Sequence, residues 1–168
     1  HLVRMNDAIS HRGPDGEGFY LYGIKNKVSR ILKSTAEIDN ESTTLDERFS
    51  VLIGHRRLAI VDLSESGFQP MVSDDKRYVI AFNGEIYNHR ELKEELLMLG
   101  HTFNSNCDTE VLLKAYVEWG ELCLEKFNGM FAFQILDTEL RSVFGARDRF
   151  GVKPLYYWKT DSSVALAS

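Results

Sequence analysis

Four strand-like segments follow one another near the C-terminal end of the chain, and no helical pattern interrupts them. They are MFAFQILD (130–137), RSVFGARD (141–148), PLYYW (154–158) and SVALA (163–167). Two helical patterns come before them, over 89–99 and from Asp108 to Trp119, and a glycine that can stop a helix follows each. Parallel sheets need strands and helices in alternation, so this order predicts an α+β fold with antiparallel sheets.

The first part of the chain predicts one helix, several strands and one polar connection. Leu2, Met5 and Ile9 are spaced along one face of a helix, and FYLYG (19–23) has the composition of a short strand. Residues 25–48 are polar, so we expect an exposed loop or a hairpin extension there. Further strands are predicted within FSVLIGHRRLAIVDLS (49–64) and in YVIAF (78–82).

The composition limits the kind of protein. The chain has 168 residues, 43% of them hydrophobic, which is enough for one well-buried core. Its net charge is −5, with no block of Lys or Arg, so nothing favours binding to nucleic acid or to an anionic membrane. Two cysteines cannot form a disulfide framework, and no Cys/His spacing matches a metal site. We therefore expect a cytoplasmic protein without a metal in this domain.

Both ends of the chain fall inside predicted elements. The first residues enter a helical pattern without an initiator Met or a capping residue, and the last residues lie in a strand pattern. We therefore expect residues 1–168 to be a single domain of a larger protein, truncated at both ends.

The sequence Asn83-Gly84-Glu85 follows the strand at 78–82 directly. An amide side chain beside an unhindered glycine N–H supplies the two donors of an oxyanion hole, and Glu85 adds a negative charge suited to an ammonium group. An Asn-Gly pair is also an ordinary turn that ends a strand. The motif by itself does not decide between these interpretations.

Three other positions carry groups of chemical interest. Arg56 and Arg57 are neighbours on a predicted strand, so only one of them can point into a pocket and hold a carboxylate. Asp108 starts a helical pattern, which suits either an N-cap or a second carboxylate for an ammonium group. Cys107 is a poor nucleophile because the adjacent Asp108 raises the pKa of a thiol, and Cys123 lies in a helical pattern and is expected in the core.

A set of motifs in a fixed order resembles the glutaminase domain of glutamine-dependent asparagine synthetases, which are class II glutamine amidotransferases. The motifs are HRGPDGEG, GHRRLAIVDLS, QPM, FNGEIYNHREL, DTEVLL, NGMFAF and ARDRFGVKPLYY. The resemblance covers nearly the whole chain, and it implies a four-layer α/β/β/α sandwich of the N-terminal nucleophile hydrolase type.

The resemblance also implies a role for each matched residue in binding L-glutamine. Arg57 is expected to hold the α-carboxylate, and Leu58, Ala59, Ile60 and Val61 to form the adjoining wall of the pocket. Asn83 and the Gly84 N–H are expected to form the oxyanion hole. Glu85 and Asp108 are expected to face the α-amino group.

Enzymes of this family attack glutamine with an N-terminal cysteine whose own α-amine is the base, and His1 lies downstream of that position. We therefore expect residues 1–168 alone to be inactive. The ammonia is expected to reach a C-terminal synthetase domain that uses ATP and Mg to amidate aspartate, and the resemblance leaves a homodimer open. A non-catalytic glutamine-binding or regulatory module, and an amidotransferase for another acceptor, are the alternatives.

Overall fold

Nine strands form three antiparallel sheets in the computed structural model, which describes residues 2–41, 49–58 and 67–168. The strand orders are β2-β1-β3, β4-β5-β6-β7 and β8-β9. Their bounds are β1 Gly16–Gly23, β2 Val28–Leu32, β3 Val51–Arg57, β4 Met71–Val72, β5 Tyr78–Ile86, β6 Gly129–Asp137, β7 Ser142–Arg147, β8 Tyr156–Lys159 and β9 Val164–Ala167. The predicted antiparallel sheets are therefore confirmed.

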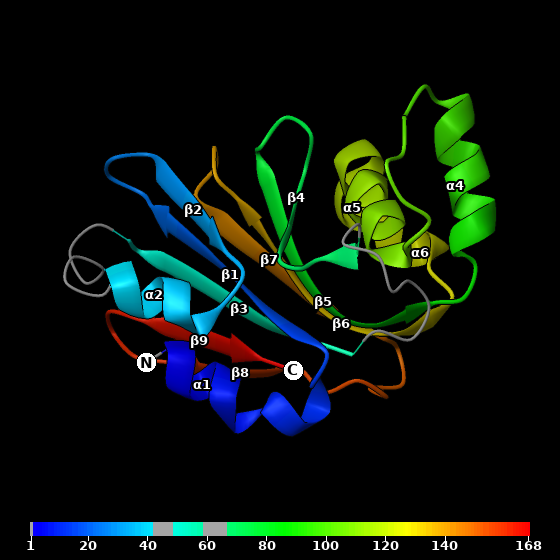
Figure 1. Ribbon diagram of the computed structural model, residues 1–168. Coiled ribbons are helices and arrows are strands. Elements are labelled where there is room, and N and C mark those ends of the chain that lie inside the picture. The colour runs from blue at the N-terminus through cyan, green and yellow to red at the C-terminus, as the bar shows by residue number, and fades with distance from the viewer. Residues whose placement is uncertain (1, 42–48, 59–66) are drawn as a thin grey trace.

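Helices cover both outer faces of these sheets (Figure 1). One outer layer holds α1 (Leu2–Ala8) and α2 (Thr35–Glu41), and the other holds α4 (His89–Met98), α5 (Asp108–Trp119) and α6 (Cys123–Lys126). Short 3₁₀ turns at Ser10–Arg12 and Gly120–Leu122 extend α1 and α5. The layers run helix, sheet, sheet, helix, which is the four-layer sandwich that the family resemblance implies.

The alternation of side chains along each strand explains the layers. On β5, Val79 and Ala81 pack between the two sheets with Tyr20 and Ile53, whereas Ile80 and Phe82 face α5. The face of β5–β7 under α4 to α6 is the richest in large apolar side chains, which include Phe131, Phe133, Ile135, Leu96, Val111 and Leu112. No helix in the described part of the chain is long and apolar enough to cross a membrane.

The polar segment 25–48 contains a helix that the sequence prediction missed. Residues 28–32 pair with β1, so the hairpin extension is confirmed, but 35–41 form α2 instead of a loop. Ser34 Oγ accepts a hydrogen bond from Glu37 N, and Glu37 Oε2 accepts one from Lys33 N, an arrangement close to a capping box but with its return bond one residue earlier. Ile38 of α2 is 5% exposed and packs with Phe19, Leu21 and Leu32. Residues 42–48 lie outside the described part.

The strand over 78–82 is longer than predicted. β5 continues through Asn83, Gly84 and Glu85 to Ile86, and these three residues pair with Ala132, Phe131 and Met130 of β6. The Asn-Gly pair is therefore not a turn that ends a strand. Gly84 has φ +155°, a value that side-chain-bearing residues rarely adopt. Its missing side chain allows β5 to keep pairing through this conformation.

Candidate active site

A cavity of about 1310 Å³ lies between β3, β9 and the β5–β6 ladder, next to α1. Of the predicted site residues, Arg57, Leu58, Asn83, Gly84, Glu85 and Asp108 all line it. They come from the end of β3, the end of β5 and the first residue of α5. The structure therefore brings together six residues from three segments that are far apart in sequence. Ala59, Ile60 and Val61 lie outside the described residues.

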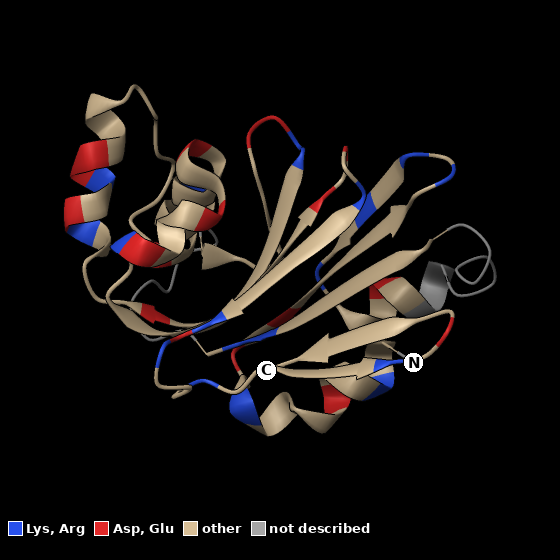
Figure 2. Ribbon diagram, turned by 180° about the vertical axis from the view of Figure 1, so that it is seen from behind, with Lys and Arg blue, Asp and Glu red and all other residues tan. Residues whose placement is uncertain are grey.

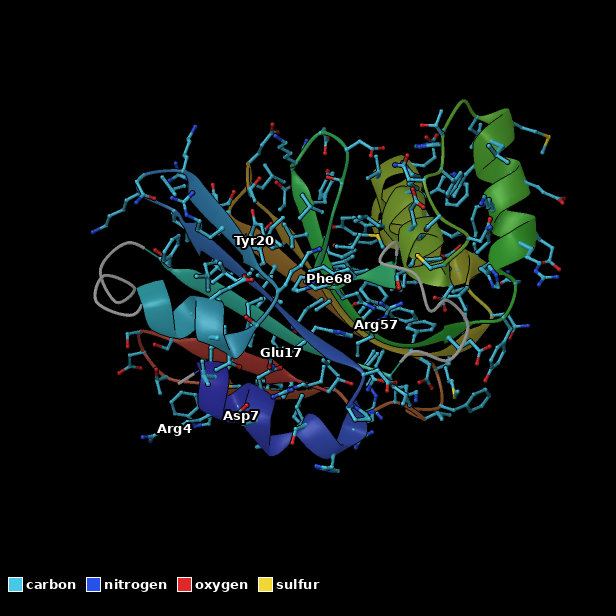
Figure 3. All side chains as sticks on the ribbon, viewed as in Figure 1. Arg4, Asp7, Glu17, Tyr20, Arg57 and Phe68 are labelled. Atoms are coloured by element: carbon cyan, nitrogen blue, oxygen red, sulfur yellow. The ribbon has the colours of Figure 1, made fainter. Side chains whose placement is uncertain are left out.

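The two neighbouring arginines of β3 face opposite sides, as the strand alternation predicts. Arg56 faces α1, where its Nη2 atom lies 2.8 Å from Asp7 Oδ1 and 3.1 Å from Glu17 Oε2. In Figure 3, Arg57 lies toward β5 and β6, whereas Asp7 lies on α1. A Cβ built on Gly67 would lie 3.0 Å from Arg57 Nη2, so residue 67 approaches the guanidinium closely. Both arginines border the cavity, but the Arg56 guanidinium is paired with Asp7 and Glu17, so Arg57 is the candidate for a ligand carboxylate.

The loop of the HRGPDGEG motif supports the backbone of Arg57. Asp15 N donates a hydrogen bond to Arg57 O at 3.0 Å. A Cβ on Gly13 would lie 2.8 Å from Arg57 N, which is closer than real side chains come. Only glycine lets this loop pack so tightly against the end of β3. The motif thus fixes the position from which Arg57 enters the cavity.

Asn83 and Gly84 are held in place from two sides. The Asn83 Nδ2 atom donates a hydrogen bond of 2.9 Å to Ser168 Oγ, just beyond β9. This leaves the second N–H of the amide for another acceptor. A Cβ on Gly84 would lie 2.7 Å from Phe131 Cα and would also collide with the Met130 carbonyl, so the site tolerates no side chain there. We refer to Asn83 and Gly84 together as the oxyanion corner.

Asp108 does not cap its own helix, so the N-cap interpretation is wrong. The N-cap of α5 is Cys107, and Asp108 is the first helical residue. Its Oδ2 atom accepts a hydrogen bond of 3.0 Å from Ile86 N, which ties the start of α5 to the end of β5. Burial raises the pKa of Asp108, and Glu85 adds to the effect, while the hydrogen bond from Ile86 opposes it. A cation in the cavity would favour the charged form of this carboxylate.

Two side chains that were not predicted as site residues hold β5 at Phe82. The buried Gln69 accepts a hydrogen bond of 2.7 Å from Phe82 N and donates one of 3.3 Å to Thr109 Oγ1. His55 of β3 lies with Nε2 3.2 Å from Phe82 O. Both contacts fix the residue just before Asn83. The QPM motif marked Gln69, but no local pattern indicated that His55 reaches a strand 27 positions away.

Neither cysteine in the chain has the surroundings of a nucleophile. Burial raises the pKa of the Cys107 thiol, and Asp108 raises it further, as the sequence predicts. Cys123, the first residue of α6, is fully buried in the core, where burial raises its pKa to about 12. A thiol with such a pKa is almost wholly protonated at neutral pH, and the thiolate is the reactive form.

Three comparisons with known proteins agree with this architecture. The family model described as "Glutamine amidotransferase domain" matches residues 23–168. The chain is 42% identical to putative asparagine synthetase [glutamine-hydrolyzing] 2 of Methanocaldococcus jannaschii, over 94% of this chain and 28% of that protein. It is also 42% identical to asparagine synthetase [glutamine-hydrolyzing] 1 of Bacillus subtilis, over 99% of this chain and 22% of that protein.

The fold also matches a solved structure. Glutamine phosphoribosylpyrophosphate amidotransferase from B. subtilis, complexed with ADP and GMP, superimposes with a TM-score of 0.73 over 95% of this chain and 37% of that one, at 22% identity. The two asparagine synthetases above are much longer than this chain, which spans 22–28% of their length. The chain therefore belongs to the glutamine amidotransferase domain family and shares it with glutamine-hydrolysing asparagine synthetases.

Proposed function

We propose that the cavity binds L-glutamine and that the full-length protein hydrolyses its side-chain amide to glutamate and ammonia. The observation that carries the proposal is the convergence of complementary groups on one cavity: the Arg57 guanidinium, the carboxylates of Glu85 and Asp108, and the oxyanion corner. Glutamine presents an α-carboxylate, an α-ammonium group and an amide carbonyl. Each of these three groups has a counterpart of matching charge or hydrogen-bonding character in the cavity.

The proposed binding mode uses opposite charges at the two ends of the amino acid. Arg57 offers a planar pair of donors to the α-carboxylate. Glu85 and Asp108 face the α-ammonium group, whose charge relieves the unfavourable burial that raises the pKa of Asp108. The side-chain carbonyl then extends toward Asn83 and Gly84. We assign the adjoining wall to Leu58, which is 54% exposed.

The nucleophile in this proposal is an N-terminal cysteine on a strand that enters the cavity beside β3. Among the described residues, β3 pairs only with β1 and β9 only with β8, so each strand has one free edge. Both strands line the same cavity along their length, and β9 runs alongside β3 in both views (Figures 1 and 2). A strand in this β3–β9 groove would pair with both edges and join the two small sheets into one.

The hydrolysis proceeds in two steps. The cysteine sulfur bonds to the amide carbon while its proton moves to the α-amine, and the carbonyl oxygen becomes an oxyanion held by Asn83 Nδ2–H and Gly84 N–H. When the oxyanion collapses, the carbon–nitrogen bond breaks and the α-amine gives its proton to the nitrogen, which leaves as ammonia. Water then hydrolyses the thioester, releasing glutamate and restoring the thiol.

We further propose that the ammonia is used to amidate aspartate in a synthetase domain of the same cytoplasmic protein. The support is the 42% identity to proteins named glutamine-hydrolysing asparagine synthetases. ATP and Mg would act in that domain. An amidotransferase for another acceptor would share the glutamine site and differ only in that further domain.

The test is glutamine hydrolysis by the full-length protein and its Arg57→Ala variant. Loss of a charged, bidentate contact should raise KM for glutamine by roughly 10–100-fold, with kcat changed much less. Arg56→Ala is the matched control, since it removes the same charge from the neighbouring position on the α1 side. It should lower stability and leave KM unchanged.

The outcomes separate the alternatives. An unchanged KM in Arg57→Ala would remove Arg57 from the carboxylate site. A wild-type protein that binds glutamine but releases no ammonia would be a glutamine-binding module instead of an enzyme. The mass of the mature N-terminal peptide also distinguishes an enzyme from a binding module, since the proposed mechanism requires cysteine as the first residue.

A further inference from the structure

The two donors of the oxyanion corner are held in different ways. Gly84 N–H belongs to the backbone of β5, which pairs there with Phe131 of β6, so the fold itself fixes its position. The backbone of Asn83 is fixed in the same way by its pairing with Ala132. This pairing does not fix the side-chain amide, because the last torsion of an asparagine side chain has a broad range. The amide therefore needs a partner outside β5.

Ser168 is such a partner. Its Oγ atom accepts a hydrogen bond of 2.9 Å from Asn83 Nδ2, and both residues are partly buried and line the cavity. Ser168 follows β9, so this hydrogen bond joins the β8–β9 pair to the four-stranded sheet that contains β5. The two residues are 85 positions apart in sequence. The position of the hydroxyl is therefore set by another sheet than the one that carries the amide.

An amide without this partner has two orientations that do not help the reaction. It can turn its second N–H away from the developing oxyanion, or it can rotate and present Oδ1, an acceptor that repels negative charge. With Nδ2 held at Ser168, the plane of the Asn83 amide has one orientation, and the second N–H of the same nitrogen is left for the substrate oxygen. Donors that are oriented before the reaction stabilise an oxyanion most, because they need no reorganisation.

We propose that Ser168 is a positioning residue for the oxyanion donor Asn83. Its hydroxyl orients the amide before glutamine is attacked, and it touches neither glutamine nor the reacting atoms. The inference rests on the proposed function, because it assigns a role in that reaction. It adds to the catalytic apparatus a residue beyond the motifs that carry the family resemblance, the last of which ends at Tyr157.

Three substitutions of Ser168 in the full-length protein isolate the hydroxyl. Ser168→Ala removes it, Ser168→Thr keeps it, and Ser168→Val has the shape of the threonine variant without the hydroxyl. Ser162→Ala is the matched control, since it removes an exposed hydroxyl from the connection between β8 and β9. For each variant, kcat and KM for glutamine hydrolysis are measured together with the thermal midpoint.

The variants without the hydroxyl should lose rate and keep binding. Ser168→Ala and Ser168→Val should lower kcat by about 5–20-fold with KM unchanged, because the donor is misplaced in the transition state while the groups that hold the two ends of glutamine are intact. Ser168→Thr should keep most of the wild-type kcat. A role of Ser168 in packing alone would not separate the threonine and valine variants. The control Ser162→Ala should have wild-type constants.

A double-mutant cycle tests whether Ser168 acts through Asn83. In the Asn83→Ala background there is no amide to orient, so adding Ser168→Ala should change kcat by less than about twofold. A further loss as large as in the wild-type background would show that Ser168 acts independently of Asn83, and the proposal would be wrong. Thermal midpoints identify any variant whose fold is lost, and the other substitutions then carry the test.

The failure of this inference differs from the failure of the proposed function. If the wild-type protein hydrolyses glutamine and both Ser168→Ala and Ser168→Val match its kcat, the positioning role is wrong and the function stands. A raised KM at unchanged kcat in these variants would also reject the positioning role, because it would place Ser168 in the binding of glutamine. If the wild-type protein releases no ammonia from glutamine, the proposed function fails, and the positioning role fails with it.

Discussion

Two acidic side chains, Asp148 and Asp108, have pKa values that folding shifts in opposite directions. Asp148 follows β7 and is 5% exposed. It accepts hydrogen bonds from the backbone amides of Phe131, Phe150, Val152 and Lys153. These bonds, with that of Lys153 the strongest influence, lower its pKa to about 2. At the cavity, Asp108 accepts a bond from Ile86 N, yet burial raises its pKa.

The difference separates a structural carboxylate from one that is suited to a ligand. The oxygens of Asp148 are surrounded by amides of the protein's own backbone, so its charge organises the loop of the ARDRFGVKPLYY motif. The charge of Asp108 is unfavourable until a cation arrives. Substitutions near Asp148 should therefore change stability, and substitutions around the cavity should change activity.

The largest effect on activity should come from Asn83→Ala. Within the described residues its side chain donates to Ser168 Oγ near the end of the chain, and its backbone pairing with Ala132 survives the substitution, so stability should change little. Loss of an oxyanion donor lowers kcat by roughly 10²–10³-fold in enzymes of known mechanism, with little change in KM. Steady-state glutamine hydrolysis by the full-length protein measures both constants. A kcat within a factor of about two of the wild type would exclude the amide as an oxyanion donor.

Asp148→Asn should lower stability and leave glutamine binding unchanged. The substitution replaces one acceptor oxygen with an NH₂ group that faces backbone N–H donors. At least one of the four backbone amides that donate to Asp148 then loses its partner. We expect the thermal midpoint to fall by on the order of 10 °C and KM for glutamine to stay at the wild-type value. Circular dichroism and the glutaminase assay measure the two. A raised KM without loss of stability would place Asp148 in the glutamine site.

Asp108→Asn is expected to have a smaller effect, and on binding. The amide oxygen can still accept the hydrogen bond from Ile86 N, so the start of α5 stays anchored. The lost negative charge should raise KM for glutamine by about 10-fold. Glu91→Gln, which removes a carboxylate from the exposed surface of α4, is the control and should leave KM unchanged. Equal KM values for the two variants would remove Asp108 from the ammonium site.

The sequence predicted the elements better than the contacts between them. Periodicity identified α4 and α5 and the strands from β6 to β9, because each is a local pattern of apolar residues. It ended β5 at Phe82, because an Asn-Gly pair is a local turn signal and pairing with Ala132 and Phe131 is not local. For α2 the signal was present, since Ser34 and Glu37 have the spacing of a capping box.

The candidate site shows the same limit. Motif resemblance named Arg57, Asn83 and Asp108, and the fold brings them to one cavity. Ser168 and His55 were missed because their contacts, to Asn83 and to Phe82 O, cross 85 and 27 positions and leave no pattern in either local sequence. The strand alternation did predict that Arg56 and Arg57 diverge, but it could not show that Asp7 of α1 and Glu17 of β1 pair with Arg56.

The smallest effect should be on the pH dependence of stability, where the two carboxylates have opposite signs. The pKa of Asp148 is lowered from 3.8 to about 2 on folding, so its stabilising contribution is complete above 3.8 and is lost as the pH falls toward 2. The pKa of Asp108 is raised above 3.8, so the folded state takes up its proton first, and acidification down to 3.8 adds stability. Thermal midpoints of the wild type and the two Asn variants, measured from about pH 6 to pH 2, resolve the two contributions. Asp148→Asn should lose part of the decline below 3.8, and Asp108→Asn should lose a gain above it. If the thermal midpoint falls equally steeply with acidification in the wild type and in Asp148→Asn, the charge of Asp148 does not contribute to the stability of its hydrogen-bonded loop.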